Sequence, residues 1–293
     1  MQTSCATAKR AVSNDRVDAV VLAGGINRIP LFEGYTPGYK ALVRFRGPAC
    51  QDPGRTDRPS ILYTLDALRA VPQVGRVCIA GPEAELRPVL EGSVHAGDTC
   101  VFAPGGESLR ETISSGLRPF AGASRVLVLT ADLPLVTPRA IADFLAACFA
   151  APSPDTPALF ISVVPRRCFT GPYERFTKPF NRFRDIEVCH GNLWLADPRL
   201  LQNSRAAARI DRIYRARKHP FATALAVGLR VGLAYVLGVH LLHLLTLEQM
   251  ARIASRHFGV TGVPVIVEHP EIAIDVDEPA DYRFVVEQLG RCG

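Results

Sequence analysis

The 293-residue chain lacks the patterns that define several common protein classes. Its eight cysteines are scattered singly with no Cys-x-x-Cys pair, which excludes a zinc site of paired cysteines and a disulfide framework. There is no internal repeat and no periodic glycine, and an apolar fraction of 48% excludes a disordered or fibrous chain. We therefore expect a globular protein whose thiols are reduced.

The N-terminal end also lacks an apolar stretch of the kind found in signal peptides. The first sixteen residues contain charged side chains and no apolar run of about seven residues, so we expect no secretory signal and a cytoplasmic location. Residues 221–247 are strongly apolar, but Arg230 interrupts them, whereas a spanning helix needs about 20 apolar residues with few charges. We expect membrane contact to be at most peripheral, through residues 205–247.

Positive charge is concentrated in one part of the chain. The formal net charge is +6, and basic residues most outnumber acidic ones between residues 161 and 220. Arg205, Arg209 and Arg212 share one helical face by their spacing. A solvated face, an anionic substrate and anionic lipid head groups would each explain this pattern. No ribonucleoprotein signature or helix-turn-helix pattern accompanies the charge, so nucleic acid is not expected as a partner.

Short β-branched runs alternate with helical patterns through the first half of the chain. Runs typical of strands buried on both faces cover residues 18–22, 76–80, 100–103, 125–130 and 159–164. Helical periodicity covers residues 60–70, 82–90, 108–117 and 138–150. The alternation predicts a three-layer α/β fold with a mostly parallel, twisted, Rossmann-like sheet.

The second half departs from this alternation. Its successive segments are basic and aromatic, then helical, then strand-like, then helical again, at residues 166–188, 200–247, 263–276 and 279–289. We therefore expect a single domain of residues 1–293 with a helical insertion at residues 200–258.

Two glycine-rich turns follow predicted strands, where ligands of parallel sheets bind. After the first strand come Gly24 and Gly25, with Arg28 and Lys40 further along. Paired glycines let backbone N–H groups approach phosphate oxygens, and the two cations would balance the phosphate charge. A plain strand-to-helix turn is the alternative. The pattern matches neither the dinucleotide-binding G-x-G-x-x-G nor the P-loop.

The second turn, at Gly105 and Gly106, opens a helix that carries Ser115. Such a turn can approach a base or a ribose closely. Ser108 fits an N-cap as well, with Glu111 completing a capping box, and the two roles are compatible.

Carboxylates stand after two predicted strands. Asp132 follows the fourth strand, and Asp275 and Asp277 end the strand-like segment near the C-terminus, where a period of two would point both side chains the same way. Mg²⁺ prefers one or two carboxylates together with substrate phosphates, so Asp132 with Asp275 or Asp277 predicts a magnesium site. The alternatives are a capped turn at Asp132 and helix-start chemistry for the last helix.

These motifs together resemble a known superfamily. Leu22-Ala23-Gly24-Gly25 with Lys40 downstream, Ala131-Asp132-Leu133-Pro134, and the closing Asp275–Asp281 are similar to the nucleotidyltransferases of GT-A-like fold. These include molybdenum-cofactor guanylyltransferases and the cytidylyl- and uridylyltransferases of sugar and alcohol phosphates. The resemblance covers residues 18–138 and 263–289, and Cys189–Leu193 is similar to a glycine-asparagine element near the acceptor pocket of some members.

The resemblance implies a role for each motif. It implies nucleotide contacts at Leu22, Ala23, Gly24 and Gly25, and base or ribose contacts at Gly105, Gly106 and Ser115. It implies phosphate contacts at Arg28 and Lys40, and an acceptor-side contact at Asn192. The implied Mg²⁺ ligands are Asp132 and Asp277, with Asp275 as substitute. The loop between Gly25 and Lys40 departs from the tighter S-x-R-M-G type of many members, which concerns Arg28 more than Lys40.

The implied activity is transfer of an NMP group from an NTP to a phosphorylated small molecule, with Mg²⁺ as cofactor and pyrophosphate as product. No general base is evident, which suits a phosphate acceptor because its second pKa of about 6 leaves it largely dianionic at pH 7. Lys178, in the basic residues 166–184, would receive this acceptor.

Two alternatives remain open from the sequence. One is a glycosyltransferase of the same fold that uses a nucleotide sugar, although Pro134 stands where such enzymes commonly complete an Asp-x-Asp element. The other is a non-catalytic, membrane-peripheral protein that has kept the fold.

Overall fold

The computed structural model describes residues 16–45, 57–93, 95, 100–152, 156–176, 178–202, 232 and 244–291. Nearly all of residues 205–247, with the predicted arginine face and membrane contact, and most of the predicted insertion 200–258 lie outside the described residues. None of the helices in the described ranges is long and apolar enough to cross a membrane.

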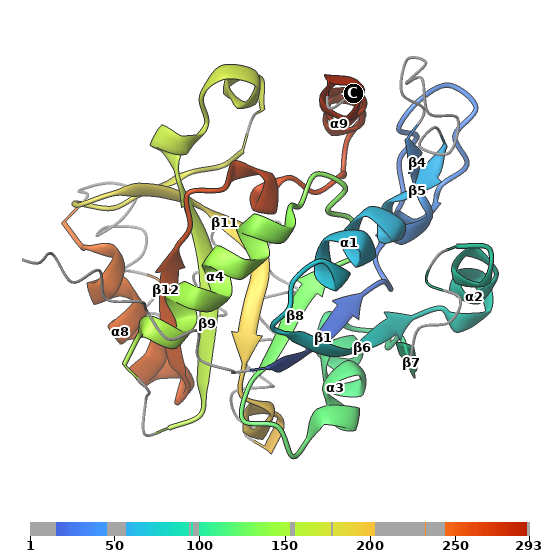
Figure 1. Ribbon diagram of the computed structural model, residues 1–293. Helices are drawn as coiled ribbons and strands as arrows, with labels where there is room; N and C mark the ends of the chain where they lie inside the picture. The colour runs from blue at the N-terminus through green and yellow to red at the C-terminus, as the bar shows by residue number, and fades with distance from the viewer. Residues whose placement is uncertain are drawn as a thin grey trace, which may run out of the picture.

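A mostly parallel sheet forms the centre of the structure (Figure 1). Its strand order is β12-β9-β11-β8-β1-β6-β7, with the short β10 paired to β11. The strands are β1 (Val17–Leu22), β6 (Val74–Gly81), β7 (Cys100–Pro104), β8 (Val126–Thr130), β9 (Ala158–Pro165), β10 (Asn181–Arg182), β11 (Glu187–Ala196) and β12 (Thr261–Ile266). The five β-branched runs predicted in the first half are thus confirmed as β1, β6, β7, β8 and β9.

Helices cover both faces of this sheet, which confirms the predicted α/β fold. One face packs against α1 (Ser60–Arg69) and α4 (Pro138–Ala150), and the other against α3 (Leu109–Leu117). The remaining helices are α2 (Glu83–Glu91), α8 (Leu247–Phe258), which packs on β12, and α9 (Pro279–Arg291). Because both faces are covered, Ala19, Val20 and Val21 of the central β1 have no exposed surface.

Strand β11 was not predicted, and it runs antiparallel between β8 and β9. Its register with β9 shifts between His190 and Trp194. A Cβ atom on Gly191 would collide with Ser162 and Ile272, so glycine is required for the close approach at this irregularity. The glycine and the irregular pairing break the period-two pattern, which is why the sequence did not reveal the strand.

The predicted strand at residues 263–276 is wrong over its second half. β12 ends at Ile266, and the chain then forms the 3-10 helix η7 (Pro270–Ala273) followed by extended residues outside the sheet. Proline has no N–H to donate to a strand ladder, and Pro270 stands where the ladder would continue. Asp275 and Asp277 therefore do not lie at the end of a strand.

The cysteines within the described ranges are free thiols, as predicted. Cys78, Cys148 and Cys189 are buried in the core. Burial raises the pKa of the Cys148 thiol to about 12, so this side chain is an inert core residue at neutral pH.

Candidate active site

The first glycine turn leaves its backbone uncovered. A Cβ atom on Gly24 would lie 3.8 Å from the Thr112 side chain, and one on Gly25 would lie 3.5 Å from Cδ of Lys40, which are ordinary contact distances. Neither glycine adopts a positive φ. Neither backbone strain nor packing therefore demands glycine here, and the missing side chains leave room for a ligand to approach the backbone.

A short hairpin returns the chain from this turn to Lys40. Strands β2 (Ile26–Asn27) and β3 (Gly38–Tyr39) pair antiparallel. As a result, the backbone N–H of Lys40 donates to the carbonyl of Gly25 at 2.8 Å. Arg28 follows β2 and is exposed. The hairpin thus explains how the long loop still places Lys40 beside the glycines.

The second glycine turn leads into α3 and is held by the capping box of that helix. The Ser108 hydroxyl accepts from the N–H of Glu111 at 3.2 Å, which confirms the predicted capping box. A Cβ atom on Gly106 would collide with the Glu111 side chain, so packing requires this glycine. Gly105 and Gly106 are both exposed, and Ser115 lies further along α3, partly buried.

Thr112 is a residue of this region that the sequence analysis missed. Its hydroxyl accepts from the Gly106 N–H at 3.0 Å and donates to the Ser108 carbonyl at 3.2 Å, while its side chain lies beside Gly24. One buried side chain therefore connects the two glycine turns. The only sequence signal was its place one turn after the N-cap.

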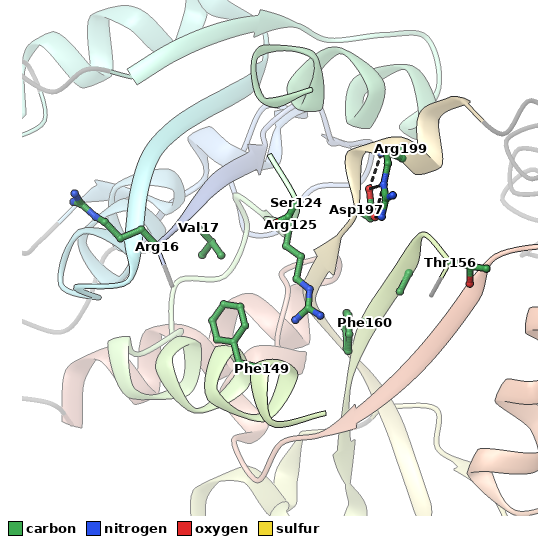
Figure 2. Close-up of a pocket in the computed structure, with 10 residues that line it drawn as sticks. Arg16, Val17, Ser124, Arg125, Phe149, Thr156, Phe160, Asp197 and Arg199 are labelled. Atoms are coloured by element: carbon green, nitrogen blue, oxygen red, sulfur yellow. Dashed lines mark hydrogen bonds and ion pairs between the residues drawn. The ribbon is translucent and has the colours of Figure 1, made fainter. Parts of the chain in front are cut away.

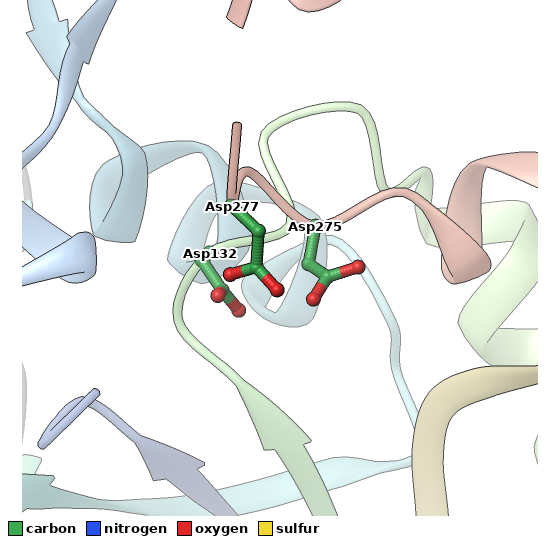
Figure 3. A group of neighbouring side chains, drawn as sticks. All are labelled: Asp132, Asp275 and Asp277. Atoms are coloured by element: carbon green, nitrogen blue, oxygen red, sulfur yellow. The ribbon is translucent and has the colours of Figure 1, made fainter. Parts of the chain in front are cut away.

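Three carboxylates from distant parts of the chain converge near the first turn (Figure 3). Carboxylate oxygens of Asp132, Asp275 and Asp277 all lie within 4.8 Å of one another. Asp132 is 6% exposed and follows β8, whereas the other two lie between η7 and α9. The sequence analysis left Asp275 and Asp277 as alternatives, and the structure brings both to Asp132.

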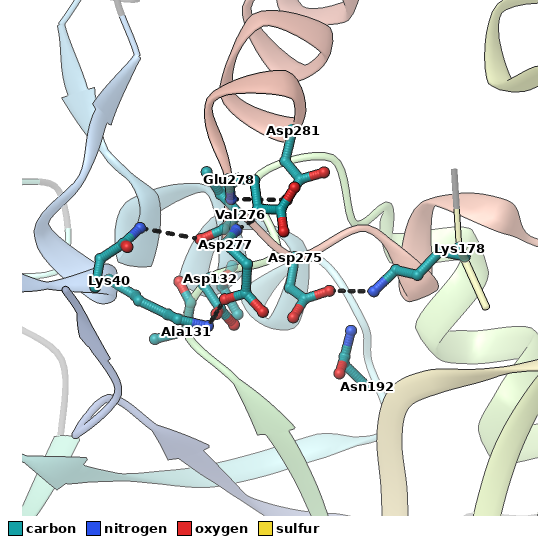
Figure 4. Close-up of polar contacts among 12 residues, drawn as sticks. Lys40, Ala131, Asp132, Lys178, Asn192, Asp275, Val276, Asp277, Glu278 and Asp281 are labelled. Atoms are coloured by element: carbon teal, nitrogen blue, oxygen red, sulfur yellow. Dashed lines mark hydrogen bonds and ion pairs between the residues drawn. The ribbon is translucent and has the colours of Figure 1, made fainter. Parts of the chain in front are cut away.

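Two lysines approach this carboxylate group from opposite sides (Figure 4). Nζ of Lys40 lies 3.1 Å from Oδ2 of Asp132 and also forms an ion pair with Asp277. Lys178 forms an ion pair with Asp275. Three carboxylates thus face two ammonium groups, which leaves one negative charge uncompensated within this group of five.

The pKa shifts follow from this balance. Burial alone would lower the pKa of Lys40, but the charges of Asp132 and Asp277 outweigh it and raise the pKa. Burial raises the pKa of Asp132, although Lys40 opposes the shift. Burial would likewise raise the pKa of Asp275, but the charges of Lys178 and Lys40 and the hydrogen bonds to this carboxylate together outweigh it, and the pKa is lowered.

The carboxylate group has the donors that Mg²⁺ prefers. Oδ1 of Asp132 is buried and has no hydrogen-bond partner among the described residues, which is costly unless a ligand uses it. The alternative for the acidic C-terminal motif was that its carboxylates cap the start of the last helix. Asp281 takes this capping role, so Asp275 and Asp277 are not needed for it. Oδ2 of Asp281 accepts from the N–H groups of Asp277 and Glu278 at 3.0 and 2.9 Å. The residues present therefore fit a divalent cation.

Three arginines of the predicted basic region, Arg166, Arg167 and Arg175, are engaged in surface ion pairs. Arg166 lies 2.9 Å from Glu187, and Arg175 lies 3.7 Å from Glu287. Lys178, in contrast, reaches the carboxylate group, and Asn192 on β11 lies on the same side of it (Figure 4). The Asn192 amide donates to the carbonyl of Ile272 at 3.3 Å.

Larger cavities lie elsewhere among the described residues. One of about 400 Å³ opens where β1 and β9 begin, at the edge opposite the carboxylates, and Figure 2 shows Arg125 and Asp197 in it. In this cavity Asp197 pairs with Arg199, and the Arg125 guanidinium lies 4.9 Å from the Phe160 ring centre. Another, about 530 Å³ and apolar, lies between α8 and the outer strands.

Comparison with known proteins agrees with this geometry. The model of the MobA-like NTP transferase domain matches residues 19–224. The chain belongs to the MobA-like NTP transferase family. No curated protein matches it. The superfamily resemblance drawn from the glycine turn and the acidic motifs is therefore confirmed.

Several solved structures share the fold of this MobA-like NTP transferase. A hypothetical transferase from Thermus thermophilus is 29% identical, with 91% of this chain and 99% of that chain covered and a TM-score of 0.67. CMP:2-keto-3-deoxy-manno-octonic acid synthetase, in complex with CTP, is 12% identical over 94% and 100%, with a TM-score of 0.51. The 2-C-methyl-D-erythritol 4-phosphate cytidylyltransferase from Thermus thermophilus is 17% identical over 94% and 98%, with a TM-score of 0.50.

The link between the two glycine turns can be tested with Thr112→Val, which keeps the shape and removes the hydroxyl. We expect a loss of about 1 kcal/mol in the free energy of unfolding, because the Gly106 N–H loses its partner. Amide hydrogen exchange at Gly106 should accelerate. Ser115→Ala on the same helix is the control and should stay within about 0.5 kcal/mol. Equal stability and exchange in the two variants would contradict the link.

Proposed function

We propose that this MobA-like NTP transferase transfers an NMP group from an NTP to a phosphorylated small-molecule acceptor and releases pyrophosphate. The observation that carries the proposal is the convergence of Asp132, Asp275 and Asp277 beside an uncovered glycine turn. Family membership supports the NTP as donor. The phosphorylated acceptor follows from the Lys178 ammonium on the far side of the carboxylates, and the cytidylyltransferase named above has an alcohol phosphate in its name.

In the proposed reaction, an oxygen of the acceptor phosphate attacks the α-phosphorus of the NTP. A new P–O bond forms there while the bond from the α-phosphorus to the bridging oxygen breaks, and pyrophosphate carries away that electron pair. A dianionic phosphate needs no proton removed before it attacks, which agrees with the lack of an evident general base. The protein's part is then to position the reactants and to neutralise charge.

Each group of residues has a place in this scheme. The backbone of residues 22–25 would cradle the triphosphate, with Lys40 and Arg28 balancing its charge, and the turn of Gly105 and Gly106 with Ser115 would contact the base or ribose. Asp132 and Asp277, with Asp275 beside them, would hold Mg²⁺, which supplies charge neutralisation at the phosphates. Lys178 and Asn192 would face the acceptor. We also propose that residues 1–293 form one domain with the insertion at residues 200–258.

The direct test is a pyrophosphate-release screen of the four NTPs with Mg²⁺ against sugar, polyol and cofactor phosphates. We expect one NTP and acceptor pair to release pyrophosphate and EDTA to abolish the release. Asp132→Asn should lower kcat/KM by about a hundredfold or more, because the buried carboxylate is lost. Asp57→Asn, at a half-exposed turn outside the carboxylate group, is the control. Release of a nucleoside diphosphate from a sugar nucleotide, with none from a bare NTP, would overturn the proposal.

The glycine cradle predicts a binding defect without a folding defect. Gly24→Ala should unfold at the wild-type temperature, because the added methyl group meets only an ordinary contact with Thr112. It should weaken NTP binding by about tenfold or more, since the methyl group occupies the space of a phosphate oxygen. Gly122→Ala is the matched control, because a Cβ there would meet nothing within 4 Å. Wild-type NTP affinity in Gly24→Ala, measured by calorimetry, would refute this role of the turn.

The acceptor side is tested by Lys178→Met, which keeps the stem and removes the charge. A charge-assisted phosphate contact contributes about 1.5–3 kcal/mol, so the KM for the acceptor should rise about ten- to a hundredfold. The KM for the NTP should change much less. Arg175→Met, in the same basic region but paired with Glu287, should leave both constants unchanged. Unchanged kinetics in Lys178→Met would remove Lys178 from the acceptor site.

A further inference from the structure

The segment that carries two of the three carboxylates has no strand ladder to hold it. After β12 ends, the last contact of ladder type is the Val267 N–H donating to the Val163 carbonyl at 3.0 Å. From there to α9 the chain contains only the short η7, yet Ile274 and Val276 are almost completely buried. The position of Asp275 and Asp277 must therefore be set by other contacts.

Two asparagine side chains provide such contacts, from two different elements. The amide of Asn192 on β11 donates to the Ile272 carbonyl at 3.3 Å. The amide of Asn27 on β2 donates to the Val276 carbonyl at 3.5 Å. Val276 stands between Asp275 and Asp277, so the Asn27 contact holds the peptide group that joins Val276 to Asp277.

Asn27 connects the glycine turn with the segment that carries Asp275 and Asp277. It is 3% exposed and lies two residues after Gly25, in the hairpin whose other strand leads into Lys40. That hairpin is closed by the Lys40 N–H donating to the Gly25 carbonyl. A ligand that orders the glycine turn therefore also orders Asn27, and with it the Val276 carbonyl.

We propose that Asn27 is a positioning residue that couples the glycine turn to the carboxylate segment, residues 274–277. It contacts neither phosphate nor cation in this arrangement and acts only through the Val276 carbonyl. This inference rests on the proposed function, because it assigns the coupled parts to the NTP and the cation. In this coupling, nucleotide binding at the turn favours the cation-binding arrangement of Asp275 and Asp277.

The first test is the affinity for Mn²⁺ alone, measured by electron paramagnetic resonance on nucleotide-free protein. Asn27→Ala removes the amide without adding bulk, and we expect Mn²⁺ binding about five- to tenfold weaker, the loss expected for one buried hydrogen bond. In an Asp277→Asn background the same change should have no further effect, because the carboxylate it positions is gone. Asn181→Ala, on β10 and away from the carboxylates, is the matched control and should bind Mn²⁺ like wild type.

The second test starts with the wild-type protein, so its deciding result does not depend on the folding of a variant. CTP or GTP, whichever binds, is added in EDTA, and amide hydrogen exchange is followed by mass spectrometry. We expect exchange to slow about fivefold in residues 274–278 as well as in the glycine turn, and Asn27→Ala to lose the first effect while keeping the second. Protection confined to the glycine turn in wild type would overturn the coupling.

The outcomes separate this inference from the proposed function. If wild-type protein binds neither Mn²⁺ nor any NTP, the proposed function fails and the coupling fails with it. If wild type binds both and Asn27→Ala binds Mn²⁺ with unchanged affinity, only the positioning role of Asn27 is wrong.

Discussion

Mutual repulsion among three carboxylates is the constraint around which this end of the molecule is organised. Like charges within a few ångströms disfavour ionisation, and burial of Asp132 adds to the cost. Two lysines offset this cost from opposite sides, and each depends on a separate part of the fold. Lys40 depends on the β2–β3 hairpin, and Lys178 on the irregular chain between β9 and β10. Loss of either lysine would leave more of this repulsion unopposed.

The sheet and the first glycine turn were predictable because their signals are local. Buried parallel strands have continuous apolar sequences, which can be recognised without the structure. Two of these runs are followed closely by functional motifs, Gly24-Gly25 and Asp132-Leu133-Pro134. The capping box at Ser108 was equally predictable, because it needs only Ser108 and Glu111, which are three residues apart in the chain. These features depend on the order of neighbours in the chain and on little else.

The features that escaped prediction depend on residues far apart in sequence. Asp275 and Asp277 were expected to converge because a strand would point them the same way, but they reach Asp132 from a segment that is not a strand. The contact from Asn27 to Val276 and the packing of Thr112 beside Gly24 exist only once the sheet has formed. No pattern within either segment encodes these contacts. Strand periodicity therefore predicted that the carboxylates converge, but for a wrong structural reason. The family resemblance predicted the same convergence without assuming a strand.

The ion pairs of Lys40 have a consequence for how the site exchanges partners. Asp132 and Asp277 already hold an internal counter-ion, so a divalent ion entering there competes with an ammonium group rather than filling an empty position. The net affinity for such an ion would therefore be the difference between two large attractions and would be smaller than either. Under the proposed function, the displaced ammonium would be free to turn toward the triphosphate. Release of products would reverse this exchange and return the lysine to its resting partners.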